Sequence, residues 1–81
     1  EKILSDIYVV ESTEIIIKNS RMAECLNNLT YREREVILRN VVLKTPLKKI
    51  AFDIGVSERM VKYYKKSALN KMRKELENNE Y

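Results

Sequence analysis

The functional side chains of this 81-residue chain are mainly cationic, and side chains of this type suit binding more than catalysis. The sequence has no histidine and a single cysteine, Cys25, so it lacks a Cys–His pair, a Ser–His base and a histidine-bearing zinc set. Its only glycine, Gly55, excludes a glycine-rich phosphate loop. We therefore expect a protein that is not an enzyme and that needs no cofactor or metal.

The positive charge is concentrated in one part of the chain. The net charge is +4, and residues 44–74 hold ten basic residues against two acidic ones. The stretches on either side, residues 1–43 and 75–81, are net acidic. A basic segment of this kind suits contact with phosphates, although a basic helix face is often only a solvated surface.

A helix-turn-helix pattern between Thr45 and Lys66 would position these charges. Thr45 can cap a helix that begins at Pro46, and Gly55 stands where that helix must stop. Ser57 is a good N-cap for a second helix. The inward positions of the two helices are apolar at helical spacing: Leu47, Ile50, Ala51, Ile54, Val61, Tyr64 and Ala68. The outward positions of the second helix are Glu58, Arg59, Lys62, Tyr63 and Lys66.

The spacing of Ala51, Gly55 and Val61 is more specific than that of an ordinary helix pair. Two helices that cross steeply need a small residue at their closest approach, and the short turn needs a glycine. The second helix needs an apolar residue six positions after that glycine, which is Val61 here. An ordinary helix pair with a glycine C-cap is the alternative, and it leaves this combination unexplained.

The rest of the chain predicts an all-α fold, a small domain of four to five helices with a C-terminal helix-turn-helix and no sheet. Residues 1–11 are expected to be a linker or short arm from an upstream domain, residues 12–76 the domain, and residues 77–81 a frayed tail. One helix is expected from Ser12 or Thr13, as the cap, to Leu29, with Cys25 buried in it.

The next helix is predicted to begin with a capping box formed by Thr30 and Glu33. Its buried stripe would include Val36, Ile37, Val41 and Leu43. Glu35 and Arg39 stand at i, i+4, a spacing that supports a helix. Its outward residues are expected to be Arg32, Arg34, Glu35 and Arg39.

Three stretches of the chain resemble region four of bacterial sigma factors, the C-terminal DNA-binding region of that family. They are Leu-Thr-Tyr-Arg-Glu-Arg-Glu-Val-Ile-Leu at residues 29–38, the helix-turn-helix, and Ser-Ala-Leu-Asn-Lys-Met-Arg at residues 67–73. The resemblance extends over residues 29–76. It implies that the helix after Ser57 lies in the major groove of the −35 promoter element, within an RNA polymerase that initiates transcription.

The resemblance also assigns roles to residues. The base-reading positions of the family fall on Glu58, Arg59, Lys62 and Tyr63. Phosphate contacts are implied for Lys48, Lys49, Ser57, Lys66 and Arg73. A surface that docks on the β-subunit flap of core RNA polymerase is implied for Arg32, Arg34, Glu35 and Arg39. The implied partners are double-stranded promoter DNA, core RNA polymerase and an anti-sigma factor, with no membrane, in the cytoplasm and associated with the nucleoid.

Two departures from the housekeeping members of the family bear on specificity. Those members have Arg-Glu-Arg after the capping residue, where this chain has Glu58, Arg59 and Met60. They also have glutamine where Tyr63 stands. The departures predict an alternative or specialised sigma factor with its own promoter sequence.

Two other interpretations of the sequence remain open. The first is a LuxR-type effector domain, whose opening helix is similar to residues 29–36, although Met-Val-Lys-Tyr-Tyr at residues 60–64 replaces the usual Thr-Val-Lys-x-His. Such a domain would bind its operator as a dimer without polymerase. The second is a module whose main partner is a protein, with DNA contact secondary.

Overall fold

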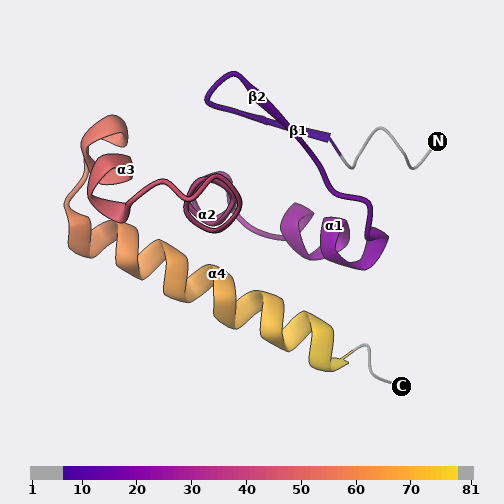
Figure 1. Ribbon diagram of the computed structural model, residues 1–81. Coiled ribbons are helices and arrows are strands. Elements are labelled where there is room, and N and C mark those ends of the chain that lie inside the picture. Colours follow the sequence, from indigo (N-terminus) through magenta and orange to yellow (C-terminus); the bar gives the residue numbers. More distant parts are fainter. Residues whose placement is uncertain (1–6, 79–81) are drawn as a thin grey trace.

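The computed structural model describes residues 7–78, which form a β-hairpin followed by helices (Figure 1). The hairpin and the last helix lie on opposite sides of the central helix α2 in that view. In chain order the elements are β1 (Ile7–Val10), β2 (Thr13–Ile16), α1 (Ser20–Asn27), α2 (Tyr31–Ile37), the π-helical turn η2 (Leu38–Val42), α3 (Leu47–Ile54) and α4 (Glu58–Asn78). No helix within the described residues is long and apolar enough to cross a membrane.

The expectation of an all-α fold with no sheet is wrong. β1 and β2 pair antiparallel, with Ile7 opposite Ile16 and Val10 opposite Thr13. Burial alternates along β1, and in β2 Ile15 is buried between exposed neighbours, so that Val10 and Ile15 point into the core while Ile7 and Ile16 are exposed. Each strand has four residues, which is too short for this alternation to stand out in the sequence. The hairpin also includes the end of the stretch expected to be a linker or arm, whose first six residues lie outside the described part of the chain.

The turn of the hairpin lacks the usual sequence signal for a turn. Glu11 and Ser12 both have positive φ, at 54° and 63°. This is the conformation of a two-residue type I′ turn, in which Asn-Gly or Asp-Gly is typical. Without glycine or asparagine, the sequence gives little indication that the chain reverses here.

We expect Ser12→Gly to raise the free energy of unfolding by about 0.5 kcal/mol. Glycine removes a left-handed penalty of roughly 1 to 2 kcal/mol, which outweighs the backbone entropy of roughly 0.4 to 1 kcal/mol that it adds to the unfolded chain. Denaturant unfolding measures the difference, with Thr13→Gly in β2 as the destabilised control. A loss of stability in Ser12→Gly would contradict the left-handed conformation of this residue.

The single helix expected between residues 12 and 29 is also wrong, because the segment contains β2 and the shorter helix α1. The cap of α1 is Asn19 instead of Ser12 or Thr13, and its Oδ1 accepts a hydrogen bond from the Met22 N–H at 3.0 Å. Ile15 and Leu26 share a helical stripe in the sequence, but they reach the same core from a strand and a helix. Cys25 is buried as predicted, with 2% of its surface exposed. Its burial, followed by the charges of Glu75 and Glu24, raises the pKa of its thiol.

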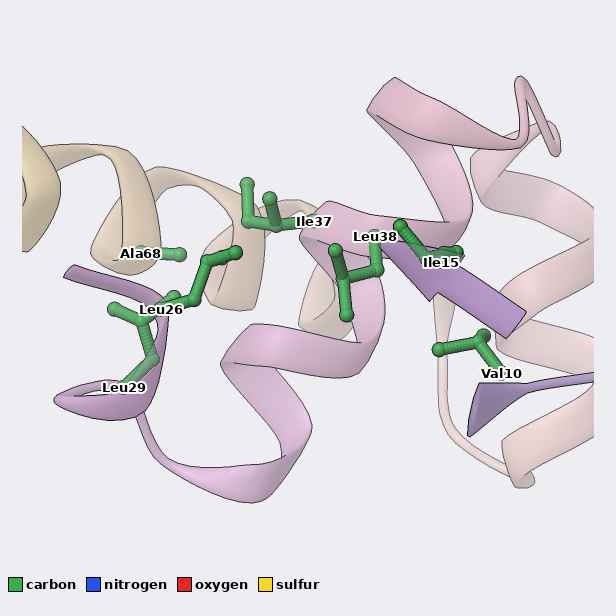
Figure 2. Close-up of a cluster of buried hydrophobic side chains, with 7 residues drawn as sticks. All are labelled: Val10, Ile15, Leu26, Leu29, Ile37, Leu38 and Ala68. Atoms are coloured by element: carbon green, nitrogen blue, oxygen red, sulfur yellow. The ribbon is translucent and has the colours of Figure 1, made fainter. Parts of the chain in front are cut away.

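The main hydrophobic core connects the hairpin to three helices (Figure 2). The side chains of the hairpin lie beside Leu38, and those of the α1 region lie near Ala68 of α4. The buried members are Val10, Ile15, Leu26, Leu29, Ile37, Leu38 and Ala68. The hairpin is therefore an integral part of the folded unit.

The helix after Thr30 confirms the predicted capping box. The Glu33 N–H donates to Thr30 Oγ1 at 3.3 Å, and the Thr30 N–H donates to Glu33 Oε1 at 2.9 Å. The helix then widens into η2, where the Leu43 N–H bonds to the Leu38 carbonyl at 3.1 Å. Val41 was expected to be buried, but it is 47% exposed because the wider turn changes which side chains face the core.

Candidate nucleic-acid interface

A second core cluster holds α3 against α4 and confirms the predicted spacing. Ile50 and Val61 are fully buried, and Ala51 is buried where the two helices approach. Val36 of α2 completes the buried part of the cluster. This packing fixes the angle between the two helices, and so it fixes which face of α4 is left to the solvent.

The turn between the helices has the geometry that the sequence predicts. Gly55 ends α3 with a φ of 75°, and its N–H donates to the Ala51 carbonyl at 3.0 Å. Ser57 caps α4, since its Oγ accepts a hydrogen bond from the Met60 N–H at 3.1 Å. The start of α3 differs by one residue from the prediction, because Pro46 takes the cap position that was expected for Thr45.

The first two turns of α4 expose every residue that was predicted to read bases. These residues share the solvent-facing side of the helix: Glu58, Arg59, Lys62 and Tyr63. Met60 is 40% exposed and Tyr63 is 62% exposed. The two are three residues apart and therefore neighbours on the helix surface. Met60 was not among the predicted base-reading residues, and the structure places it beside them.

All the residues predicted to contact phosphates are exposed: Lys48, Lys49, Ser57, Lys66 and Arg73. From Arg59 to Lys74 the sequence has seven basic residues and no acidic one. A shallow groove along α4 is lined by Lys62, Lys65, Lys66, Leu69, Asn70 and Arg73. The structure therefore places Lys62, which was predicted to read bases, in one cationic groove with Lys66 and Arg73, which were predicted to contact phosphates.

Arg39 does not lie outward as predicted, because only 3% of its surface is exposed. One of its guanidinium nitrogens donates to Asp53 Oδ2 at 2.6 Å and to the carboxylate of Glu11. Glu35 Oε2 lies 3.7 Å from the other terminal nitrogen, which confirms the i, i+4 pair. Burial by itself would lower the pKa of Arg39, but its bonds with Asp53 and Glu11 raise it. Hydrogen bonds from Arg39 and Lys49 lower the pKa of Asp53.

The other residues predicted to face polymerase are partly exposed. Arg32 pairs with Glu35 at 3.1 Å. Arg34 donates to the Leu26 carbonyl at 3.1 Å, and its guanidinium carbon lies 5.7 Å from the centre of the Tyr8 ring. The contacts of Arg34 stabilise α2 against α1 and the hairpin, whereas the Arg32–Glu35 pair lies within α2. The polymerase-facing role of Arg32, Arg34 and Glu35 stays a prediction.

Glu33 anchors the middle of α4 to the start of α2, which the sequence did not reveal. Its side chain is buried. In addition to the hydrogen bond from the Thr30 N–H, its carboxylate accepts hydrogen bonds from Ser67 Oγ at 2.6 Å and from Lys71 Nζ at 3.0 Å. Burial raises the pKa of this carboxyl, but the hydrogen bonds outweigh burial and lower it to about 2. The sequence showed the role of Glu33 in the capping box. It did not show Ser67 and Lys71 as partners of Glu33, because they are distant in sequence.

The fold and its exposed cationic face define a helix-turn-helix protein of the DNA-binding class. Residues 20–72, more than half of the chain, match the family model described as Sigma-70, region 4. The chain belongs to this family, as the sequence resemblance predicted. No curated protein and no solved structure matches the chain. Membership of the family indicates a DNA-binding role in transcription.

Proposed function

We propose that this chain is the −35-recognition domain of an alternative or specialised sigma factor that directs RNA polymerase to its promoters. The exposed face at the start of α4, in a chain of the sigma-70 region 4 family, carries the proposal. The action is non-catalytic, because binding alone places polymerase at the start site. The family match supports the general role, and the promoter element and the partner are parts of the proposal.

The first two turns of α4 would lie in the major groove, where side chains can reach base edges. Arg59 and Lys62 can donate to O6 and N7 of guanine, and Glu58 can accept from N4 of cytosine. Lys48 and Lys49 on α3 and Lys66 on α4 would contact phosphates on either side. These phosphate contacts hold the domain on any DNA, whereas the base contacts select the sequence.

The proposal of a specialised sigma factor rests on the residues of the reading face, which is the exposed side of the first two turns of α4. Glu58, Arg59, Met60 and Tyr63 replace the side chains expected in a housekeeping member of the family. Met60 and Tyr63 give this face an apolar part among charged neighbours. The matching apolar group in the major groove is the methyl of thymine, so we expect thymine in the recognised element.

The proposed protein partner is core RNA polymerase at the β-subunit flap, bound through α1 and α2. In the view of Figure 1, α1 and α2 lie above α4, toward the hairpin. Arg32, Arg34 and Glu35 supply polar groups for this surface. An anti-sigma factor that occupied the same surface would compete with polymerase.

A selection of bound duplexes from a random DNA pool tests the proposal, run with the protein plus core RNA polymerase and with the protein alone. Polymerase-dependent enrichment of one asymmetric hexamer would support the sigma role and identify the element. Enrichment of an inverted repeat by the protein alone would instead indicate a LuxR-type regulator. No enrichment in either arm would favour a module that acts mainly through protein contacts.

Uracil substitution measures the role of Met60 and Tyr63 directly. Replacing a contacted thymine by uracil removes one methyl group, and we expect this to weaken binding of the unaltered protein by about fourfold, since one buried methyl is worth roughly 0.8 kcal/mol. Tyr63→Ala or Met60→Ala should bind the thymine and uracil duplexes equally well. If both variants still distinguished the two duplexes at every thymine, these residues would not contact the methyl groups.

A further inference from the structure

Three carboxylates from three separate elements converge on the buried guanidinium of Arg39. Glu11 comes from the hairpin turn, Glu35 from α2, and Asp53 from α3. The Arg39 side chain is 4% exposed, whereas those of Glu11 and Asp53 are 34% and 29% exposed. A cation removed from water needs these partners, so the position of α3 depends on the same side chain as the position of the hairpin.

The backbone around Arg39 also fixes the segment that leads into α3. The Arg39 carbonyl accepts a hydrogen bond from the Thr45 N–H at 2.8 Å. The Asn40 side-chain amide donates to the Thr45 carbonyl at 2.8 Å. Residues 39 and 40 therefore hold the chain just before α3, while the Arg39 side chain holds Asp53 near the end of that helix.

The same cluster reaches the proposed DNA contacts through Lys49. Its Nζ lies 3.2 Å from Asp53 Oδ2, the oxygen that Arg39 also binds. α3 carries both Lys48 and Lys49, and it sets the angle of α4 through Ile50 and Ala51. A shift of α3 would therefore move the phosphate-binding lysines relative to the reading face of α4.

We propose that Arg39 is a positioning residue for the DNA-binding surface, and that Glu11 in the hairpin is its distant partner in that role. The inference rests on the proposed function. It assigns the hairpin a part in DNA affinity, although the hairpin lies on the side of α2 away from α4 (Figure 1). Without the Glu11 carboxylate, the buried guanidinium of Arg39 loses one of its three partners, so its side chain is no longer held in one position and Asp53 of α3 loses a fixed partner.

The variant Glu11→Gln tests the proposal because positioning predicts weaker DNA binding and simple electrostatics does not. Removal of a negative charge should leave DNA affinity unchanged or increase it if only the net charge matters. Positioning predicts that the dissociation constant for the selected duplex rises by about three- to tenfold. Amide hydrogen exchange in α3 of the free protein should become faster by a similar factor.

Glu14→Gln is the matched control, since Glu14 is an exposed residue of the same hairpin and the charge change is the same. We expect this control to leave both the dissociation constant and α3 exchange unchanged. Arg39→Lys keeps the positive charge but lacks the planar guanidinium group that can bind several carboxylates at once. We expect it to raise the dissociation constant and to speed amide exchange in α3, as Glu11→Gln does.

Unchanged α3 exchange in Glu11→Gln would overturn the proposal, as would faster exchange with undiminished DNA affinity. Equal effects of Glu14→Gln would also overturn it, because charge alone would then be responsible. If the unaltered protein bound no duplex even with polymerase, the proposed function would fail. The exchange measurement would then still decide whether Arg39 and Glu11 position α3.

Discussion

Acidification is expected to remove about 3 kcal/mol of stability through one carboxyl group, that of Glu33. Its pKa is about 2 in the folded protein and 4.5 in its ordinary state. A group with a lowered folded pKa contributes its full stabilisation above the unfolded pKa and loses it as the pH falls toward the folded pKa. The stabilisation from Glu33 is therefore lost as the pH falls from 4.5 to about 2. The difference of roughly 2.5 pKa units corresponds to about 3 kcal/mol at most.

Denaturant unfolding across this pH window, with Glu33→Gln for comparison, measures the contribution. We expect the variant to be less stable by about 2 to 3 kcal/mol near neutral pH, since the bonds from Ser67 and Lys71 then end on a neutral amide. The difference should shrink as the pH falls and Glu33 itself becomes protonated. Glu24→Gln, at an exposed position on α1, is the control. If the free energy of unfolding changed with pH in the same way for Glu33→Gln and for the unaltered protein, Glu33 would not titrate in this way.

Loss of Arg59 should weaken binding to the cognate promoter by about 1 to 3 kcal/mol, or roughly fivefold to 150-fold. The reason is that an arginine which donates to both O6 and N7 of guanine carries much of the discrimination at that base pair. We expect Arg59→Ala to relax the preference at one position and to leave the others intact. Binding to a set of single-base variants of the selected hexamer measures this.

Lys66→Ala is the matched control for Arg59→Ala, because both residues are exposed cations on α4. A phosphate contact should affect all sequences alike, and it should reduce the slope of log affinity against log salt by about one. If the two variants instead weakened every duplex equally, the base-reading role of Arg59 would be wrong.

The helix-turn-helix could be predicted because its determinants are local. Ser57 and Gly55 act on the turn that contains them, and Ala51 and Val61 face each other across that turn. Their spacing therefore identifies the motif without knowledge of the rest of the fold. The same holds for the capping box of Thr30, in which both partners lie within one helical turn.

The hairpin and the buried ionic contacts depend on long-range packing, which the sequence pattern does not show. Arg39 looks like an outward helical residue until the hairpin brings Glu11 to it from 28 positions away. Glu33 bonds to partners 34 and 38 positions away on α4. A strand of four residues with a Glu-Ser turn gives no strong signal for either the strand or the turn.

The burial of Cys25 makes the protein a reporter of its own local opening. Because the chain has a single cysteine, an alkylating reagent that modifies thiols can react at that one position. Cys25 lines a pocket together with Lys71, Lys74 and Glu75 of α4, and the residue is only 2% exposed, so we expect alkylation to need a local separation of α1 from α4. Its raised pKa lowers the thiolate fraction and slows the reaction further. The alkylation rate therefore measures how often α1 detaches, and no probe has to be added to the protein for this measurement.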